Sequence, residues 1–307
     1  MIRQIVSKIK LLFNDFKSKS NFYSYPKSIL LTVSPYCPYR GQYLHQEILK
    51  YIEREYTNTI TLYKHSDRIK ENNENIPAIV WIMWWQGESQ MPLLVKKCYE
   101  TIKQNSEGKD VILITHNNLS NFLELPQYIL EKVNAGKISI THLSDIIRMG
   151  LLSKYGGLWI DATIYLTDKI EFPYKSFFTI RQHLKYDRYV LGGNKWTPYL
   201  LGSTKNHLLP NFAFQFFLDY WKKEDNLIDY FLVDYVIATA YKSFDEIHTD
   251  IDRQSYQYEN IYLLSKNLNS LYNENYINSN SINKLSYKKP YQVINNGKLT
   301  NYGYITK

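Results

Sequence analysis

The segment 141–167 constrains the fold of this 307-residue chain more than any other part of the sequence. Apolar residues at helical spacing predict a helix from Ser144 to about Tyr155. The Gly156-Gly157 pair predicts a chain reversal, because glycine adopts left-handed backbone angles without a Cβ clash. A continuous apolar run from Leu158 to about Leu166 then predicts a strand buried on both faces. This order of elements favours an α/β fold.

Three charged side chains accompany these two elements. Asp145 and Arg148 are three residues apart, so they project from one side of the helix. Asp161 follows the first residues of the apolar run, where burying a carboxylate costs free energy unless a cation or a hydrogen-bond donor meets it. We therefore expect the three groups to converge at the edge of a sheet. A simpler interpretation stays open, in which Asp145 only favours a helix N-terminus and Arg148 only pairs with it.

The residues S-D-I-I-R, followed by L-L-x-K-Y-G-G-L-W-I-D-A-T, resemble the signature of the capsular polysaccharide synthesis family of glycosyltransferases. That family resembles a wider DXD-motif group that includes the glycosyltransferase sugar-binding region family and the clostridial glucosylating toxins. The sequence departs from the motif at one position, because Thr163 replaces the second Asp and the motif reads D-A-T. The resemblance implies a GT-A-like fold and glycosyl transfer, and the group expected to be transferred is a hexosyl group.

The resemblance also implies roles for the charged residues. Asp145 and Arg148 would hold the donor sugar, and Asp161 would hold the ribose or the sugar. Asp161 and Thr163 would be the ligands of a Mn²⁺ or Mg²⁺ ion. Thr163 weakens the case for a metal, because these ions prefer anionic oxygen to a hydroxyl. The expected donor is a nucleotide-diphosphate sugar, most simply a UDP-sugar, and the expected acceptor is a lipid-linked glycan repeat unit.

Residues 76–87, I-P-A-I-V-W-I-M-W-W-Q-G, predict the first strand of a nucleotide-binding sheet, whose ligands lie beyond the carboxyl ends of its strands. In the family, a Trp at the end of this strand stacks on the nucleotide base, and the matching residue is Trp84. A place in the core remains the alternative for Trp84, and we expect Trp81 to be a core residue.

Strands and helices alternate through the rest of the chain, which predicts a Rossmann-type, mostly parallel sheet with flanking helices. The expected helices and strands are Pro92–Asn105, Asp110–Thr115, Asn118–Leu123, Pro126–Val133, Ile138–Ile140, Phe177–Ile180 and Asn211–Lys223. Residues 189–202 are expected to be a loop with short strands that closes over an acceptor, and the polar residues 263–280 to be a loop.

Two further candidates lie in the C-terminal part. A helix is expected to begin at 229–235, and its Asp234 either holds a local network or faces the site as an acid or base. Residues 284–288, K-L-S-Y-K, resemble an element near the end of family members. Its Lys288 either neutralises donor phosphate or stays exposed.

The N-terminal residues 1–20 combine helical apolar spacing with five basic residues and one acidic residue. This pattern predicts an amphipathic helix that either lies on anionic lipid or packs on the catalytic domain. A helix at Gln42–Tyr56 and a polar linker at 70–75 follow. We therefore expect an N-terminal helical extension, 1–75, and a GT-A-like domain, 76–307.

The net charge of +8 suits phosphate-bearing ligands or an anionic membrane. A nucleic-acid partner is not expected, because no RRM, KH or helix-turn-helix signature is present and the basic excess is concentrated in residues 1–20. Two cysteines without metal-ligand spacing fit the reducing cytoplasm. The favoured function is sugar transfer to a cell-surface polysaccharide at the inner membrane face. The alternative is a non-catalytic glycan- or membrane-associated assembly protein with a degenerate DXD site.

Overall fold

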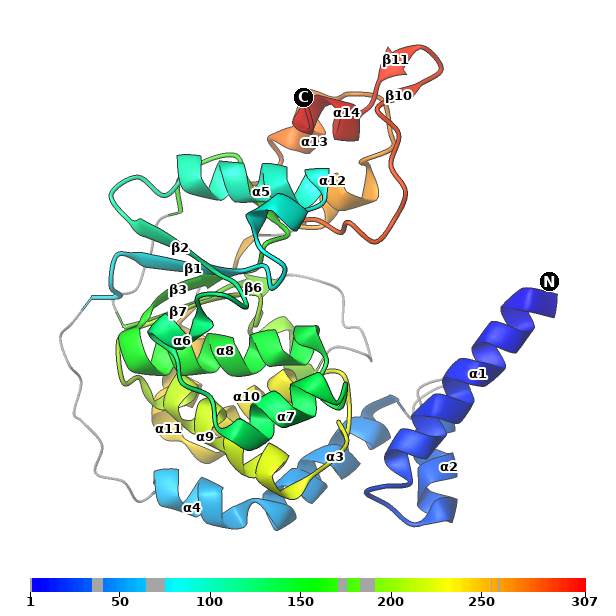
Figure 1. Cartoon of the computed structure of the whole chain (residues 1–307), viewed down its shortest axis with the longest axis vertical. Helices are drawn as coiled ribbons and strands as arrows, with labels where there is room; N and C mark the ends of the chain where they lie inside the picture. Colours follow the sequence, from blue (N-terminus) through cyan, green and yellow to red (C-terminus); the bar gives the residue numbers. More distant parts are fainter. Residues whose placement is uncertain are drawn as a thin grey trace.

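A five-stranded sheet forms the centre of the protein, in a computed structural model that describes residues 2–34, 41–64, 75–170, 176–182, 191–254, 256–258 and 260–307 (Figure 1). The strand order is β2-β1-β3-β7-β5. The strands are β1 (Ile79–Met83), β2 (Asp110–Ile114), β3 (Gly157–Ile160), β5 (Phe177–Thr179) and β7 (Leu200–Ser203). β1 pairs in parallel with β2 and β3, while β7 runs antiparallel between β3 and β5. Four strands therefore share one direction, and the predicted α/β class with a mostly parallel sheet is confirmed.

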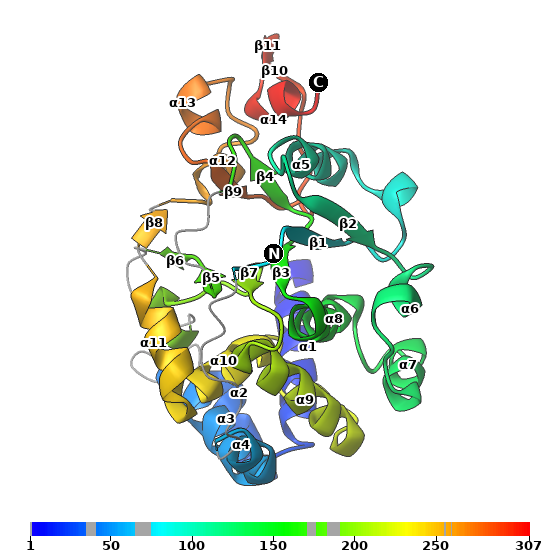
Figure 2. The ribbon, with the colours of Figure 1, turned by 90° about the vertical axis from the view of Figure 1, so that its left-hand side faces the viewer.

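The two faces of the sheet are covered by different helices, as both views show (Figures 1 and 2). Successive side chains of a strand point to opposite faces. Val80 and Ile82 of β1 accordingly pack with α5 (Leu93–Gln104), and Trp81 packs on the other face with α8 (Ile140–Tyr155). Trp81 is a core residue, as expected. Burial on both faces explains why the strands read as continuous apolar runs.

Helices stack in further layers beyond α8. α9 (Leu208–Lys223) packs on α8, and α10 (Leu232–Ser243) and α11 (Asp245–Arg253) pack on α9. The N-terminal helices α3 (Gly41–Glu55) and α4 (Thr57–Lys64) join the same hydrophobic core through contacts with α10 and α9. The smaller helices on this side are α6 (Leu119–Phe122) and α7 (Gln127–Asn134). The division at residue 75 stays a prediction, and most of its linker, 70–74, lies outside the described residues.

The C-terminal segment covers the outer side of α5. β4 (Ile164–Leu166) pairs with β9 (Ile282–Lys284) in a separate two-stranded sheet. Leu94 and Cys98 of α5 pack with Leu264 and Leu285 in a small core of their own. The other elements here are α12 (Leu263–Lys266), α13 (Glu274–Ile277), the hairpin β10 (Ile294–Asn295) and β11 (Lys298–Leu299), and α14 (Asn301–Ile305). The segment that follows β3 is therefore held by β-sheet hydrogen bonds to β9, more than 100 residues later in the sequence.

The N-terminal pair α1 (Ile2–Lys19) and α2 (Tyr25–Val33) lies at one end of the molecule, and α1 points away from it (Figure 1). Among the described residues no helix is both long and apolar enough to cross a bilayer. The remaining short elements are the 3-10 helices η2 (Glu88–Gln90) and η3 (Leu191–Asn194) and the pair β6 (Arg181–Gln182) and β8 (Tyr256–Tyr258).

Two predicted strands are wrong. The run 158–166 is not one strand, because the chain leaves the sheet at Asp161 and turns, with the Ile164 N–H donating to the Asp161 carbonyl at 2.9 Å. The expected strand 138–140 is absent, because Ser139 caps α8 by accepting a hydrogen bond from the His142 N–H at 3.2 Å. Apolar content identified both segments as ordered, but it could not separate two short strands or recognise a cap.

Other boundaries also differ. The helix expected from 229 begins at Leu232, because the Asp229 carboxylate accepts a hydrogen bond from the Phe231 N–H at 2.9 Å and forms a local turn. The polar residues 263–280 contain α12 and α13. Within 189–202 the described residues include β7, which is a strand of the central sheet, whereas 189 and 190 lie outside the described residues. Gly156 and Gly157 do have positive φ, of 68° and 98°, as the reversal requires.

Candidate active site

Two neighbouring parallel strands end at one edge of the sheet and place Trp84 and Asp161 there. β1 and β3 run in register, with Trp81 opposite Trp159. Trp84 follows β1 directly, and Asp161 follows β3 directly. The Asp161 N–H donates to the Tyr199 carbonyl at 3.0 Å, which fixes the start of the turn. The carboxyl edge is where α/β sheets bind their ligands.

Arg148 joins two carboxylates that come from different elements. Its Nη1 donates to Asp145 Oδ1 at 2.6 Å, and its Nη2 donates to Asp161 Oδ1 at 3.0 Å. The guanidinium carbon lies 4.9 Å from the centre of the Trp159 ring, and the Arg148 side chain is only 4% exposed. α8 begins at Ile140, so Asp145 lies beyond its first turn. The three groups converge as the spacing predicts, and the Asp145–Arg148 pair is not an ordinary surface pair.

Lys284 completes the cluster from the opposite end of the chain. The pairing of β4 with β9 sets Ile164 opposite Lys284, beside the turn that carries Thr163. Lys284 Nζ donates to Asp161 Oδ2 at 2.7 Å and to Thr163 Oγ1 at 2.8 Å. It also lies 4.7 Å from the centre of the Tyr199 ring. Asp161 therefore contacts two cations, one at each oxygen.

These cations set the protonation state of Asp161. Burial acts to raise the pKa of its carboxyl group, but the Lys284 ammonium and the Arg148 guanidinium outweigh burial and hold the pKa at about 2, below the usual 3.8. The Trp159 Nε1–H adds a hydrogen bond to Asp161 Oδ1 at 2.9 Å. Asp161 is therefore a fixed anion at neutral pH, with a side chain that is 27% exposed.

His142 and Trp221 support Asp145 from behind. Trp221 Nε1 donates to His142 Nε2 at 2.9 Å, so the neutral ring carries its proton on Nδ1. His142 Nδ1 lies 3.5 Å from Asp145 Oδ2. All three side chains are inaccessible or nearly so, which fixes the position of the carboxylate. His142 was not predicted from the sequence, although His142 and Asp145 have the same three-residue spacing as Asp145 and Arg148.

Aromatic side chains lie around this cluster. The Trp84 ring makes an edge contact with Tyr287, at 5.5 Å between ring centres, and its Nε1 donates to the Gln90 carbonyl at 3.3 Å. Partial burial, followed by the negative charges of Asp145 and Asp161, raises the pKa of Tyr230. The Tyr230 side chain is 61% exposed. Trp84 is only partly buried, so its indole can contact a ligand.

Asp234 lies in the first turn of α10, near the cluster but with a partner of its own. Trp196 Nε1 donates to Asp234 Oδ1 at 3.1 Å. Burial raises the pKa of Asp234 to about 7; the Trp196 hydrogen bond opposes this rise, and the Asp145 charge adds to it. Asp234 therefore belongs to a local network, and its role as an acid or base that faces the site stays a prediction.

Lys288 differs from Lys284 in its surroundings. Lys288 is exposed, and the hydrogen bond described for it is made by its backbone N–H, to Ser286 Oγ at 3.4 Å. Lys288 was predicted from the K-L-S-Y-K element, but the lysine at the carboxylates is Lys284. Lys284 ends β9 whereas Lys288 lies beyond this strand, and strand alternation could not separate the two lysines from the sequence, because residues four positions apart share one face.

The oxygens of Asp161 and Thr163 do not fit a divalent metal site in this arrangement. The hydroxyl of Thr163 and one oxygen of Asp161 are bonded to the Lys284 ammonium, and the other oxygen of Asp161 accepts from Arg148 and Trp159. Mg²⁺ and Mn²⁺ take anionic oxygens and repel cations. The Asp161–Thr163 pair is therefore occupied by protein cations and donors.

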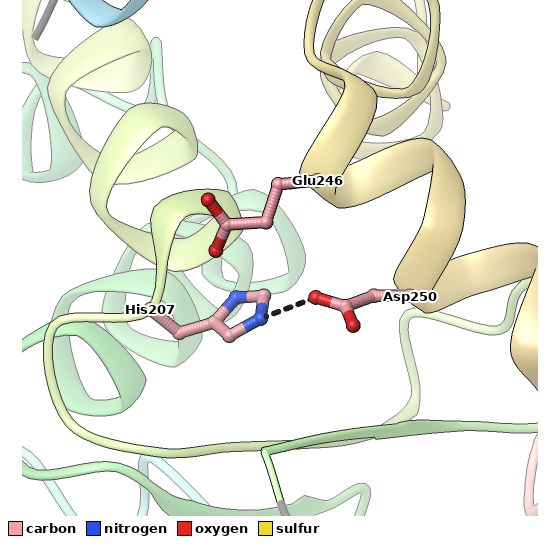
Figure 3. A group of neighbouring side chains, drawn as sticks. All are labelled: His207, Glu246 and Asp250. Atoms are coloured by element: carbon pink, nitrogen blue, oxygen red, sulfur yellow. Dashed lines mark hydrogen bonds and ion pairs between the residues drawn. The ribbon is translucent and has the colours of Figure 1, made fainter. Parts of the chain in front are cut away.

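His207, Glu246 and Asp250 form a second group with metal-ligand chemistry, between α9 and α11 (Figure 3). His207 Nδ1 accepts from the Leu209 N–H at 3.3 Å, so the neutral ring carries its proton on Nε2 and donates it to Asp250 Oδ2 at 3.0 Å. Both ring nitrogens are thus used, one as a helix cap and one in a bond to α11. We assign this group a structural role.

Comparison with known proteins identifies the family of the chain. The model of a family described as capsular polysaccharide synthesis protein matches residues 38–305. The chain belongs to this family. No curated protein matches its sequence. A solved structure titled "PaToxG Glycosyltransferase" is similar at 14% identity and a TM-score of 0.42, over 68% of this chain and 82% of that chain. That likeness is too loose to transfer residue roles, so the site rests on the geometry described above.

Proposed function

We propose that this capsular polysaccharide synthesis protein is a glycosyltransferase that moves a hexosyl group from a UDP-sugar to a lipid-linked repeat unit of a capsular or exopolysaccharide. The observation that supports it best is the buried Arg148, which joins Asp145 and Asp161 at the carboxyl edge of the sheet. Sugar transfer requires that donor hydroxyls are held so that C1 faces the acceptor and that charge on the leaving diphosphate is neutralised. Rigid carboxylates suit the first requirement, because they can hold sugar hydroxyls, and fixed cations suit the second, because they can neutralise the diphosphate.

The proposal assigns a role to each group. Asp145 and Arg148 hold the hydroxyls of the donor sugar, and Asp161 holds the ribose or the sugar. Trp84 stacks on the base from the neighbouring strand. Asp234, with a pKa of about 7, receives the proton of the acceptor hydroxyl.

The D-A-T sequence favours one alternative, an assembly protein that binds glycan without turnover. The two functions are separated by measuring nucleotide release from UDP-hexoses in the presence of membrane-extracted lipid-linked glycan. A glycosyltransferase releases UDP in proportion to the glycan it extends. An assembly protein binds the same glycan and releases no UDP.

Trp84→Ala should weaken UDP binding roughly tenfold or more, because stacking of a base on an aromatic ring contributes about 1–3 kcal/mol. Titration calorimetry with UDP measures the affinity directly. The indole of Trp84 is partly buried, and its Nε1 bond to the Gln90 carbonyl holds the ring in place. Removal of the ring leaves the carboxylate cluster intact.

Trp85→Ala is the matched control for this variant. Trp85 is also partly buried, but its ring lies 6.1 Å from that of His116, on the α8 side of the sheet. Its removal should leave UDP affinity within about twofold. Unchanged affinity in Trp84→Ala, or an equal loss in both variants, would show that Trp84 does not contact the base.

A cavity beside α1 supports a lipid-linked acceptor. It has a volume of about 410 Å³ and lies among α1, α3 and the segment 227–231. Leu44, Ile228 and Phe231 give it a mostly apolar lining, which also includes Tyr230. A mostly apolar cavity suits the lipid end of an acceptor.

α1 should bring the protein to an anionic membrane on the cytoplasmic side. Its Ile9 and Phe13 are 60% and 63% exposed and lie four residues apart on one face of the helix, and the basic Lys17 follows them at the same spacing. Replacement of these two residues by serine should lower binding to liposomes with 30% phosphatidylglycerol roughly tenfold or more, because two apolar side chains no longer enter the lipid. Co-sedimentation measures the bound fraction.

Substitution is a better test than deletion of residues 1–20. Ser18 Oγ donates to the Leu227 carbonyl at 3.0 Å and the Lys19 side chain is buried, so deletion would also disturb the cavity. The matched control is Val293→Ser/Ile294→Ser, which removes exposed apolar side chains from the β10–β11 hairpin. Equal liposome binding by the α1 variant and the wild type would exclude a membrane role for this helix.

A further inference from the structure

We infer that the Lys284 ammonium takes the place of a divalent metal ion at the D-A-T motif, so that the donor diphosphate is bound and its charge neutralised without metal. This inference rests on the proposed function, since it concerns the same nucleotide-sugar site. It starts from a contact that joins residues 123 positions apart: Lys284 Nζ to Asp161 Oδ2 at 2.7 Å, and to Thr163 Oγ1 at 2.8 Å.

The group formed by Asp161, Thr163 and Lys284 has the same formal charge as a DXD motif with a bound divalent ion. A DXD motif with a bound divalent ion combines two carboxylates with two positive charges, so its formal charge is zero. In this chain one carboxylate is replaced by the neutral hydroxyl of Thr163, and the ion is replaced by the single positive charge of Lys284. The sum is again zero, and the loss of the second Asp is matched by an ammonium at that position. D-A-T is therefore not simply a decayed motif.

The surroundings fix the ammonium in place. β9 pairs with β4, and the Leu285 N–H donates to the Thr163 carbonyl at 2.9 Å, so the strand that carries Lys284 is bonded to the turn that carries Thr163. The Tyr199 ring lies 4.7 Å from Nζ and stabilises its charge. An ammonium has three N–H donors, and two are used by the described residues. The third is available to a phosphate oxygen.

A metal ion would have to displace this arrangement. It would share Asp161 Oδ2 with a cation at hydrogen-bond distance, and the second oxygen of Asp161 already accepts from Arg148 and Trp159. Like charges at such a distance repel strongly in a partly buried site. The cluster therefore holds two fixed cations, Arg148 and Lys284, on opposite sides of one carboxylate.

In the transfer step the bond between sugar C1 and the β-phosphate oxygen breaks, and its electron pair stays on that oxygen. The acceptor hydroxyl oxygen forms the new bond to C1 and gives up its proton, for which Asp234 is the base. The leaving nucleoside diphosphate gains one negative charge. Lys284 neutralises this charge in the transition state, where such stabilisation accelerates the reaction.

The first test uses the wild-type protein and UDP, with calorimetry in 5 mM EDTA and again in 5 mM MnCl₂. We expect the two affinities to agree within about threefold. UDP binding that requires Mn²⁺ would overturn the inference and leave the proposed function standing. If UDP does not bind under either condition, and GDP does not bind either, the proposed function fails and the inference fails with it.

The second test replaces Lys284 by methionine, which keeps the length of the side chain and removes its charge. Lys284→Met should lower UDP affinity roughly tenfold or more, because a charge-assisted bond to phosphate is lost, and should lower the affinity for uridine by less than twofold. An equal loss for both ligands would indicate a structural role and contradict the inference. Lys284→Arg retains a cation and should recover part of the UDP affinity.

Lys288→Met is the matched control, because Lys288 lies on the same segment but is exposed. It should leave UDP affinity within about twofold. A larger loss in Lys288→Met than in Lys284→Met would transfer the phosphate contact to Lys288 and overturn the assignment.

The third test restores the usual motif in the variant Thr163→Asp/Lys284→Ala. This variant has two carboxylates and lacks the ammonium, so it should bind UDP weakly in EDTA and at least tenfold more tightly in MnCl₂. A thermal melt of each variant confirms that it is folded. UDP binding by the double variant that does not respond to Mn²⁺ would contradict the exchange of ammonium for metal.

Discussion

Asp161→Asn should lower the turnover of sugar transfer by at least about 100-fold. The Asn carbonyl can still accept from Arg148 and from the Trp159 indole, but its amide group then faces the Lys284 ammonium, so a donor meets a donor. The negative charge between the two cations is also lost. Lys284 and Arg148 therefore move apart, and groups that must hold the donor lose their geometry. UDP release per folded molecule is the quantity to measure.

The same substitution should lower the free energy of unfolding at pH 7 by about 2 kcal/mol, because the folded pKa of Asp161 is about 2 against 3.8 for the free group. A lowered pKa stabilises the fold above about pH 4, and this contribution is lost as the pH falls toward 2. The variant should therefore show less acid-dependent loss of stability than the wild type between pH 4 and pH 2. Urea unfolding at several pH values measures this.

Asp250→Asn is the matched control for Asp161→Asn. Asp250 is a nearly inaccessible carboxylate that accepts from His207 Nε2 at 3.0 Å, away from the Arg148 cluster. Its substitution should lower stability and leave the turnover of the folded fraction within about threefold. Near-normal turnover in Asp161→Asn would remove Asp161 from the active site, whatever happened to the melting temperature.

The sequence predicts the site residues whose positions depend on neighbours close in the sequence. Asp145 and Arg148 share one face of a helix, Asp161 follows a buried strand, and Trp84 ends the neighbouring strand; each of these placements depends on residues within a few positions. The parallel sheet then brings the ends of the two strands together. This is why three of the charged groups and the aromatic candidate can be placed from the sequence alone.

The remaining site residues, Lys284, His142 and Trp221, reach the site through contacts between segments far apart in the sequence, which no local sequence pattern predicts. Lys284 reaches Asp161 only because the chain turns after β3 and β4 pairs with β9. Trp221 reaches His142 through the packing of α9 on α8, over 79 positions. The predicted strand 158–166 was too long and did not include the turn at Asp161. That turn leads into β4, whose pairing with β9 brings Thr163 to Lys284. An apolar run shows that a segment is buried, but not which segment lies beside it.

Asp234→Asn should lower turnover by about 100-fold or more, the usual range for loss of a general base. In the wild type, the rate should rise with pH through an apparent pKa near 7, because the ionised carboxylate accepts the acceptor's proton. This limb of the pH profile should be absent in the variant. The Asn carbonyl still accepts the Trp196 hydrogen bond, so the local network is kept.

Asp234→Asn should not lower the stability of the protein at pH 8, in contrast to its effect on turnover. Burial raises the folded pKa of Asp234 to about 7 from 3.8, so between these values the folded protein keeps a proton that the unfolded chain has lost. Stability from this group therefore decreases as the pH rises from about 4 to about 7. Asp234→Asn removes the decrease, and its melting temperature at pH 8 should equal or exceed that of the wild type.

Trp196→Phe separates a base in the active site from a carboxyl group that is merely buried. The Trp196 Nε1–H bond lowers the pKa of Asp234, so its loss should raise that pKa and move the limb of the pH–rate profile to higher pH. A buried group without a catalytic role would change the melting curve and leave the profile where it is. If Asp234→Asn retains near-normal turnover and the profile stays fixed in Trp196→Phe, the base for the acceptor hydroxyl must be a different group.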